Sequence, residues 1–575
     1  MSDFNPMDRA RVQVHRSSFD LSQKRLFTCK IGELVPTYWQ IAIPGTKYQI
    51  KSDWFTRTVP VNTAAYTRIK EYYDFFAVPL RLISRALPQA FTQMTDYITS
   101  ADSPTSNTTS LSKVPYTPLS SISSLMNTQA SSSGNMDAVG LPFVYGAARL
   151  LNMLDYGSFM SSTAENKNVV AKAYLGFEPS SDQENPLVYS SSFDVNLLPL
   201  LTYQKIYYDF FSNSQWEKHL AYAYNVDYWT GVGPLQLSTP MFMLRYANYP
   251  KDYFLGVLPS SQYGSVAVLP SSFLASQPSH RVVAYSPAQS VTLQNPASAT
   301  SVLTNGSFSS ARDIRINSDL SALSLRATEY LQRWKEVIQF ASKDYSDQMQ
   351  AQFGIKAPEY MGNHCHYIGG WSEVININEV VNTNLDAADS QASIAGKGVS
   401  SSSGHQLTYD CGAEHCVIMC IYHAVPLLDW SITGQSPQLL VTNITDFPQP
   451  AFDQLGMQPV PMVCLTNDAR LAPQGNVGYN LRYWQWKSNI DRVSAGFMHD
   501  GIYKSWAAPL NGHDVLSIEG SINYTSFKVR PTQLNTIFQP QVSFENCSVA
   551  YDQLLCNVNF QVYAVQNLDR NGLPY

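Results

Sequence analysis

The sequence predicts a mainly β protein built from antiparallel strands. Short alternations of apolar and polar residues recur through the 575-residue chain, and clusters of Pro, Gly, Ser and Asn interrupt them. In the C-terminal stretch CNVNFQVYAV, alternate residues from Cys556 to Ala564 are apolar, and Asn557, Asn559 and Gln561 fall between them. Successive side chains of a strand point to opposite faces, so this stretch predicts a half-buried strand.

A second strand is predicted in YYDFFAVPLRLI, from Tyr72 to Ile83, with Pro79 ending or bending it because proline cannot donate to a central ladder. A helix is expected from Leu201 to Trp216, after Pro199, and its aromatic residues on several sides predict burial against more than one neighbour.

One long amphipathic helix is predicted between residues 323 and 354. Apolar residues recur there at helical spacing, and Gly354 supplies the stop. The residues of this predicted apolar stripe are Leu331, Trp334, Ile338, Ala341, Tyr345 and Met349. We expect Leu331, Trp334 and Ile338 to form the helix core, with Trp334 buried on the inner face.

Three polar tracts read as insertions into one core, because their Ser, Thr, Gly and Asn content suits long excursions. They run from Thr99 to Asp137, from Ser260 to Ser310 and from Asn384 to His405. The expected organisation is an N-terminal arm and first strand in residues 1–60, followed by the core in 61–575 with insertions near 99–137, 260–310 and 384–405. Short alternations within 260–310 are expected to pair into small hairpins.

Composition limits the classes of partner. Charged residues make up 14% of the chain where about 25% is usual, while aromatic residues reach 12%, a composition that suits large protein contacts. The net charge of −6 excludes a uniformly basic nucleic-acid coat, so any such contact must be local. The N-terminal arm is the best local basic patch, and its candidate DNA or inner-surface contacts are Arg9, Arg11, Arg16, Lys24 and Arg25.

The chain is expected to be made and assembled in a cytoplasm. No apolar run is long enough for a membrane span, and the polar start MSDFNPMDRARVQ lacks the centre of a signal peptide. Eight irregularly spaced cysteines fit reduced thiols better than a disulfide framework.

The stretch EHCVIMCIYHAV, from Glu414 to Val425, raises the question of a metal site, because it holds two Cys and two His. Strand geometry places His415 and His423 on one face and Cys416 and Cys420 on the other, which does not converge on one ion. A buried strand without metal is therefore predicted. The neighbouring NHCHYIGG has the same alternation and reads as a turn-rich connection, so no metal is expected there either.

No enzymatic mechanism is apparent in the sequence. The GxSxG, HExxH, P-loop and GxGxxG signatures are missing, and acid pairs such as Glu71 and Asp74 would face opposite sides of a strand. We therefore expect a protein that is not an enzyme, with no cofactor, no metal and no catalytic residue.

Several stretches in a fixed order resemble the major capsid protein of the Microviridae, in particular of gokushovirus-like single-stranded DNA bacteriophages. These stretches are RSSFDLS from Arg16, GELVP from Gly32, YYDFFAVPLRLI from Tyr72, LPLLTYQKIYYDFF from Leu198, LRYANYPKDYFLGVLPSSQYGS from Leu244, LQRWKE from Leu331, AQFGI from Ala351, and AGKGVSSSSGH from Ala395 with EHCVIMCIYHAVP after it. The family carries a Gly-rich loop at the Ala395 segment and an ordinary strand after it. The serine-rich tracts and the two cysteines of the latter strand depart from the family pattern.

The resemblance implies a single eight-stranded antiparallel jelly roll with long loop insertions and a few helices. It also implies self-assembly of about sixty copies into a T=1 icosahedral shell around a circular single-stranded DNA genome. The implied partners are the chain itself, the packaged DNA, a small DNA-binding or pilot protein of the phage and a host cell-surface receptor contacted by surface loops. The implied location is the virion, assembled in the bacterial host cytoplasm and without membrane insertion.

Two alternatives come from other classes. A carbohydrate-binding jelly-roll protein of a non-viral type would also use exposed Tyr and Trp. A β-rich hydrolase has only scattered carboxylates in its favour.

Overall fold

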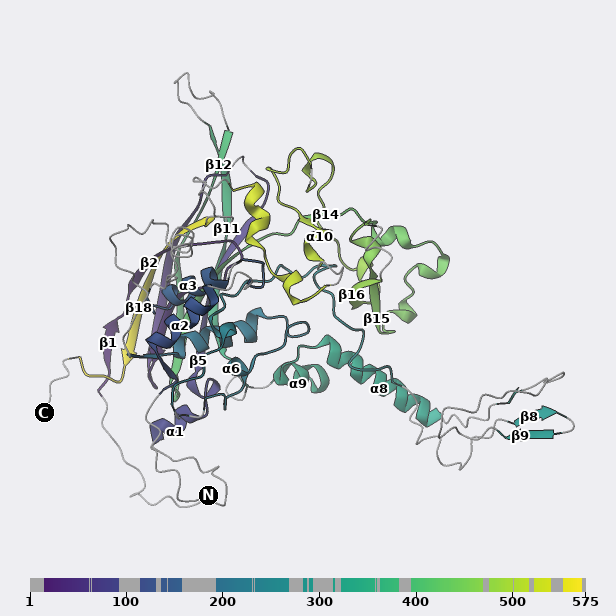
Figure 1. Ribbon diagram of the computed structural model, residues 1–575, viewed down its shortest axis with the longest axis horizontal. Coiled ribbons are helices and arrows are strands. Elements are labelled where there is room, and N and C mark those ends of the chain that lie inside the picture. Colours follow the sequence, from purple (N-terminus) through teal and green to yellow (C-terminus); the bar gives the residue numbers. More distant parts are fainter. Residues whose placement is uncertain are drawn as a thin grey trace, which may run out of the picture.

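The computed structural model describes most of the chain and is shown in Figure 1. The residues it describes are 15–61, 63, 65–92, 114–130, 136–141, 143–157, 193–229, 231, 233–267, 283–286, 289–292, 314–315, 322–356, 358, 362–381, 394–468, 475–499, 501–516, 522–538 and 552–570. Arg9 and Arg11, and most of the predicted insertions, lie outside these residues.

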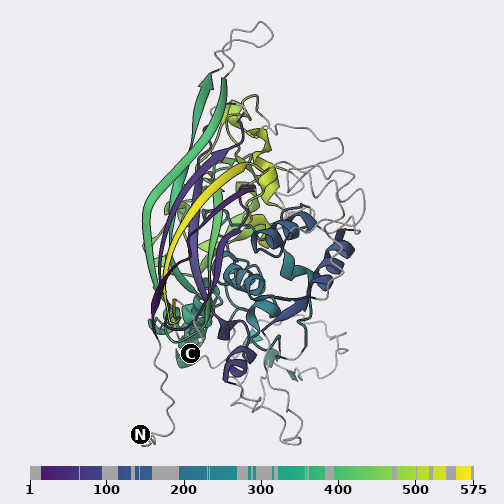
Figure 2. The same ribbon diagram turned by 90° about the vertical axis from the view of Figure 1, so that its left-hand side faces the viewer.

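One antiparallel sheet of nine strands dominates the architecture, with the order β1-β18-β4-β12-β11-β5-β13-β3 and with β2 beside β1 on the same edge of β18. Its strands are β1 (Ser17–Asp20), β2 (Gln23–Cys29), β3 (Val35–Ala42), β4 (Lys47–Thr58), β5 (Ile69–Pro79), β11 (His366–Val381), β12 (Ile394–Asp410), β13 (Cys416–Pro426) and β18 (Leu554–Gln566). Figure 2 shows that the sheet is strongly curled. The prediction of a mainly β protein with few helices is confirmed.

The curl brings two halves of the sheet into contact through their inner faces. Phe560 of β18 lies 5.3 Å from Tyr38 of β3 and 6.0 Å from Phe75 of β5, between ring centroids. Trp54 of β4 lies 4.6 Å from Tyr73 of β5. These strands are not neighbours in the sheet order, so the rings form a core between the β2-β18-β4-β12 half and the β3-β13-β5-β11 half.

The carboxyl group of Glu71 is buried in this core. Glu71 of β5 is 0% exposed and accepts hydrogen bonds from Trp54 Nε1 and Tyr422 OH, each at 3.0 Å. Burial raises the pKa of Glu71 although surrounding hydroxyl and indole groups donate to it. Its two oxygens therefore tie β4 and β13 to β5 across the core.

The two strands predicted most clearly are confirmed. Along β18, Cys556 to Ala564 alternate between buried and partly exposed positions as predicted. β5 ends at Pro79, where a 3₁₀ turn from Leu80 to Leu82 follows.

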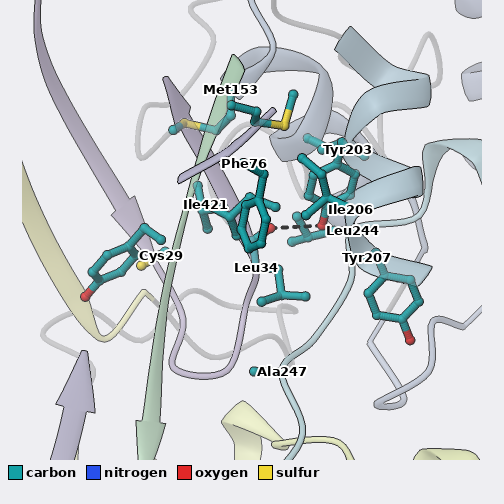
Figure 3. Close-up of a cluster of buried hydrophobic side chains, with 14 of the residues drawn as sticks. Cys29, Leu34, Phe76, Met153, Tyr203, Ile206, Tyr207, Leu244, Ala247 and Ile421 are labelled. Atoms are coloured by element: carbon teal, nitrogen blue, oxygen red, sulfur yellow. Dashed lines mark hydrogen bonds between the residues drawn. The ribbon is translucent and has the colours of Figure 1, made fainter. Parts of the chain in front are cut away.

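Helices cover the outer face of the β3-β13-β5 half. The covering elements are α3 (Phe143–Met153) and α5 (Leu198–Ile206), and a π turn (Tyr207–Phe211) continues α5. Figure 3 shows side chains of α5 gathered beside Phe76 and Ile421 of the sheet, with Tyr203 donating a hydrogen bond of 2.9 Å to Leu34 O. The helix predicted after Pro199 is confirmed, and it ends at Phe211 rather than at Trp216.

The long helix predicted near residue 340 is two helices. α8 (Ala322–Phe340) ends before a four-residue break, and α9 (Tyr345–Phe353) begins after Asp344, whose carboxylate accepts from Ser346 N. This N-cap stabilises the start of a second helix. The spacing of apolar residues continues across the break and therefore could not reveal it. Gly354 ends α9 in the left-handed conformation, with φ of 69°, as predicted.

The predicted helix core is wrong for the single chain. Leu331 and Trp334 are 40% and 47% exposed, Ile338 is half-buried, and the fully buried residue of this part of α8 is Gln339. α8 packs on the body through polar groups, since Gln215 Nε2 donates to Gln339 O at 2.8 Å. The apolar stripe of α8 therefore faces outward.

The third predicted insertion is partly a strand. Residues 394–405, including GKGVSSSSGH, belong to β12 and pair with both β4 and β11. The small residues fit a crowded place, because a Cβ on Gly398 would lie 2.5 Å from Thr58 Cγ2. The Gly and Ser content reflects close packing and a bulge between Ser402 and His405 rather than a loop.

The N-terminal stretch is also more integrated than predicted. Residues 1–60 hold β1 to β4 rather than one strand, and β1 and β2 both pair with β18 of the same chain. Residues 17–29 thus complete the subunit's own sheet.

Smaller elements surround the main sheet. The short strands are β6 (Tyr116–Pro118), β7 (Asp194–Asn196), β8 (Val283–Ser286), β9 (Gln289–Thr292), β10 (Ile314–Arg315), β14 (Trp430–Ser431), β15 (Met457–Pro461), β16 (Asn476–Leu481) and β17 (Leu510–Asn511). The remaining helices are α1 (Ala86–Thr92), α2 (Leu119–Ala130), α6 (Ala221–Tyr224) and α10 (Gly512–Val515). In the described part of 260–310, β8 and β9 form the small hairpin that was predicted.

Candidate functional site

The outer face of the β2-β18-β4-β12 half is the candidate functional site, and we call it the open face. In Figure 2 these strands face the viewer without a covering helix, whereas the helices lie behind the sheet and to the right. The outward side chains follow from strand alternation, because the inward ones form the core described above. The open face is therefore a broad, curved surface held by a rigid sheet.

The open face carries more cations than carboxylates. The outward residues of the four strands align in rows across the sheet, such as Lys24, Asn559 and Asp53. Its cations are Lys24, Lys47, Lys51, Arg57 and Lys397, and its carboxylates are Asp53 and Asp410. The chain is acidic as a whole, so this excess of positive charge is local.

Both carboxylates already have partners within the subunit. Asp53 accepts from Gly404 N at 3.3 Å and from Gln561 Nε2 at 3.1 Å. Asp410 pairs with Lys47 Nζ at 3.2 Å, and the hydrogen bond from Gly412 N is the largest of the effects that lower the pKa of its carboxyl. Among the described residues, Lys24, Lys51 and Arg57 make no ion pair, so they are available to an external anion.

A groove of about 650 Å³ lies in the middle of this face. Its lining is polar apart from two rings, and consists of Lys24, Asp53, Trp54, Phe55, Ser401, Ser402, Ser403, Asn557 and Asn559. Arg57 lies over the Phe55 ring, with its guanidinium carbon 4.7 Å from the centroid. Amides, hydroxyls, an ammonium group and a ring capped by a guanidinium suit phosphates and bases of a single strand.

The predicted arm contacts do not all reach this face. Lys24 lines the groove, and Arg16 lies at the edge of the sheet, where its Nε donates to Asn567 Oδ1 at 2.8 Å. Arg25 is a correction, because alternation along β2 turns it inward, where it pairs with Asp155 at 2.7 Å. Its charge is thus used within the subunit.

A buried ionic cluster, which sequence reasoning missed, joins α3 to the segment that follows β2 and to the segment that precedes β18. Arg149 of α3 donates from Nη2 to both carboxylate oxygens of Asp552, at 2.6 and 2.8 Å, and from Nη1 to Glu33 Oε2. Lys30 Nζ lies 3.5 Å from Asp552 Oδ1. Desolvation alone would raise the pKa of Asp552, but Arg149 and Lys30 outweigh it and lower that pKa. No local sequence signal joins residues 30, 149 and 552.

A second buried cluster surrounds Arg245. Its guanidinium lies over the rings of Tyr207 and Tyr208, at 4.7 and 5.2 Å, and it donates to Gln204 Oε1 at 2.9 Å. Lys528 lies nearby, with its Nζ 3.7 Å from Glu217 Oε2. Burial lowers the pKa of Lys528 to about 8 and outweighs the opposite effect of this ion pair. Because Arg245 contacts Gln204 of α5, we treat the cluster as a structural anchor for this helix.

The EHCVIMCIYHAV segment is a strand, as predicted. β13 is buried along its whole length between β3 and β5. His423 stacks on Tyr72 with centroids 4.8 Å apart, and burial lowers the pKa of His423 to about 3. Within the described part of the chain, no three His, Cys, Asp or Glu side chains are placed to hold a metal ion.

The NHCHYIGG connection precedes and enters β11. His364 Nε2 lies 3.1 Å from Asp344 Oδ1, so this connection contacts the N-cap residue of α9. No helix in the described ranges is long and apolar enough to cross a membrane.

Comparisons with known proteins give the family. The sequence profile of the family described as capsid protein (F protein) matches residues 10–125 and 186–567. The capsid protein VP1 of Chlamydia phage 1 is 23% identical over 291 residues, which cover 48% of this chain and 46% of that relative. Family membership favours a structural role over the carbohydrate-binding and hydrolase alternatives. The chain therefore belongs to the capsid protein (F protein) family of Microviridae-type bacteriophages.

Proposed function

We propose that this capsid protein is the major subunit of a T=1 icosahedral shell that encloses a circular single-stranded DNA genome. The observation that carries the proposal is the open face, because a curved sheet with unpaired cations and amide groups suits the inner wall of a shell around nucleic acid. A capsid protein self-assembles and belongs in the virion. The cations and amides of the open face would bind the phosphates of the packaged DNA.

The strand order supports an eight-stranded jelly roll. If β2, β3, β4, β5, β11, β12, β13 and β18 are numbered one to eight along the chain, the sheet order is 1-8-3-6-5-4-7-2. Two wrapped Greek keys place strands 1, 8, 3 and 6 in one sheet and strands 5, 4, 7 and 2 in the other. The cross-core ring contacts of Phe560 and Trp54 fit this division, with β11 and β12 joining the two sheets at one side.

Assembly can be measured directly as particle mass. A subunit of 64.2 kDa in about sixty copies gives a shell of about 3.9 MDa before DNA. We expect closed particles of that mass when the protein is expressed with its phage partners, by mass photometry and negative-stain microscopy. A distribution that stops at small oligomers would contradict the proposal.

The net charge of −6 argues for a cationic partner in packaging. The five open-face cations of each subunit neutralise only part of a packaged polyanion, so we include a small DNA-binding protein of the phage among the partners. Assembly is proposed to take place in the bacterial cytoplasm, which agrees with the free cysteines among the described residues.

The outward apolar stripe of α8 and α9 is the proposed contact between subunits. Four large side chains of these helices are each at least 47% exposed: Tyr330, Trp334, Tyr345 and Phe353. Exposed apolar surface of this kind usually marks a site of contact with another protein. The partner proposed here is a second copy of the chain, because a shell repeats one contact many times.

Replacing Trp334 by alanine should affect assembly more than folding. About half of the side chain is already exposed, so the free energy of unfolding should fall by only about 1.5 to 2.5 kcal/mol, half the cost of a fully buried tryptophan. The yield of particles should fall severalfold. Thermal melting of the subunit and sedimentation of particles measure the two effects.

Glu329→Ala is the control for Trp334→Ala, since Glu329 is exposed on the other side of α8. It should leave both the melting temperature and the particle yield unchanged. Normal particle yield from Trp334→Ala would remove this helix from the proposed contact.

The tract between Ser260 and Ser310 is proposed to project from the shell and contact the host. Figure 1 shows the β8-β9 hairpin beyond the start of α8 and far from the sheet. The first residues of the tract serve another purpose, because Lys335 Nζ donates to Ser265 O at 2.6 Å and Gln332 Oε1 accepts from Ala267 N at 3.0 Å. The candidate host-contact segment is therefore narrowed to 268–310.

Replacing residues 268–310 by a short Gly/Ser linker should leave shells intact and abolish or redirect adsorption to cells. The anchoring contacts with α8 remain in this variant, so folding of the body should not change. Adsorption of purified particles to host cells is the measurement. A variant that also replaces 260–267 should in addition lower the melting temperature. Unchanged adsorption by the shorter replacement would refute the host contact.

A further inference from the structure

Two cysteines meet at the turn between β12 and β13. Cys411 follows the last residue of β12, and Cys416 is the first residue of β13. The Cys416 thiol donates to Cys411 Sγ at 3.5 Å. Cys411 is 7% exposed and Cys416 1%, and the residues of the turn between them, Gly412 to Glu414, are exposed. A thiol pair thus lies directly beneath a solvent-facing turn.

The backbone around the pair is held at both ends. Cys411 N donates to Thr46 O at 3.0 Å, and Gly45 N donates to Gly412 O at 2.6 Å. Cys416 is paired with Ala42 on one side and with Pro79 on the other. A disulfide needs its sulfurs about 2.05 Å apart, so the two Sγ atoms must approach by only about 1.5 Å, a movement within the reach of side-chain rotation in a short turn.

The other described cysteines offer a comparison. Burial and the neighbouring Cys556 raise the pKa of the Cys29 thiol, but Cys29 and Cys556 lie on β2 and β18 inside the core and are 0% and 3% exposed. Cys420 shares β13 with Cys416 and is 0% exposed. Within the described residues, the Cys411–Cys416 pair therefore combines a thiol–thiol contact with an adjacent exposed turn.

We propose that Cys411 and Cys416 are a redox modification site, at which a small peroxide converts the two thiols into an intramolecular disulfide that closes the β12–β13 turn. The thiolate of Cys411 attacks one oxygen of hydrogen peroxide, the O–O bond breaks, and the products are a sulfenic acid and hydroxide. The Cys416 thiol then attacks the Cys411 sulfur, its proton joins the departing hydroxyl, and water leaves. The net reaction oxidises two thiols and reduces one peroxide to two waters.

The local environment keeps this modification slow. The hydrogen bond with Cys416 and burial raise the pKa of the Cys411 thiol, so only a small fraction of it is the reactive thiolate at neutral pH. The disulfide would tie down a turn that is already docked on the body, where Glu414 pairs with Arg81 at 2.7 Å and His415 stacks on Phe91.

The turn allows a sharp test on the full-length protein. After treatment with hydrogen peroxide, remaining thiols are blocked with N-ethylmaleimide under denaturing conditions, and the protein is digested with trypsin and a glutamyl endopeptidase without reduction. Cleavage after Glu414 separates Cys411 from Cys416, so the two peptides stay together only through the disulfide. We expect this linked pair by mass spectrometry, with Cys29, Cys420 and Cys556 alkylated.

Variants check the assignment. Cys411→Ser and Cys416→Ser should each abolish the linked pair and the rise in melting temperature that peroxide gives the wild type, whereas Cys420→Ser should retain both. The wild-type digest decides the matter even if a variant fails to fold. Full alkylation of Cys411 and Cys416 after peroxide, or a Cys29–Cys556 link formed to the same extent, would overturn the proposal.

Discussion

Replacing Arg149 by methionine is expected to lower the free energy of unfolding by about 3 to 5 kcal/mol, the usual cost of breaking a buried ion pair from one side. The Arg149 side chain is 5% exposed and its partners Glu33 and Asp552 are 0% and 12% exposed. Methionine fills similar space without charge. The loss then comes from leaving the carboxylates of Glu33 and Asp552 in the interior without the guanidinium that pairs with both of them.

The matched control is Arg85→Met, because Arg85 also pairs with an aspartate, Asp227, but both side chains are about half exposed. An exposed pair of this kind contributes at most about 1 kcal/mol. The double variant Arg149→Met/Glu33→Gln should recover part of the loss, since it also removes the charge of Glu33, one of the two buried carboxylates that Arg149 pairs with. Shifts of the urea midpoint measure all three. Equal shifts for Arg149→Met and Arg85→Met would contradict the role of the cluster.

The same cluster predicts a dependence on pH. The pKa of Asp552 is lower in the folded chain than its ordinary value of 3.8, so its contribution to stability is present above that value and is lost as the pH falls through the folded pKa. Arg149 is the largest of the charges that lower this pKa. The difference in stability between wild type and Arg149→Met should therefore narrow as the pH falls below about 4.

Local patterns predicted those elements whose environment is local. The alternation along β18, the end of β5 at Pro79 and the stop at Gly354 depend on neighbours in sequence, and each was predicted correctly. The first half of β12 was missed because Gly and Ser have low strand propensity. This segment is held in a strand by its backbone pairing with β4 and β11, which the local sequence does not show.

The candidate site was predicted only in part for the same reason. Lys24 was identified from the charge of the N-terminal arm, but Lys51 and Arg57 join it through the pairing of β18 with β2 and β4. Arg25 is adjacent to Lys24 in sequence and points to the other face of β2. Trp334 was assigned to a core because helical periodicity shows that a stripe exists and cannot tell whether this subunit or another one covers it.

The triple variant Lys24→Gln/Lys51→Gln/Arg57→Gln should assemble into shells that hold less DNA. These side chains point outward from a rigid sheet and make no ion pair among the described residues, so their loss should not change subunit stability. Each phosphate contact in a single strand contributes about 0.7 to the slope of log K against log salt. Three lost contacts should therefore lower that slope by about 2 for a bound oligodeoxynucleotide.

The control for charge itself is Arg68→Gln/Arg81→Gln/Arg85→Gln, which removes three cations that lie away from the open face and pair with Asp491, Glu414 and Asp227. Both triple variants change the net charge of the subunit by the same amount. Only the open-face variant should lose DNA affinity and genome content, as measured by fluorescence anisotropy across a salt series and by the ultraviolet absorbance ratio of purified particles. Similar losses in both variants would mean that overall charge governs packaging, and unchanged genome content in the open-face variant would place the DNA contacts elsewhere.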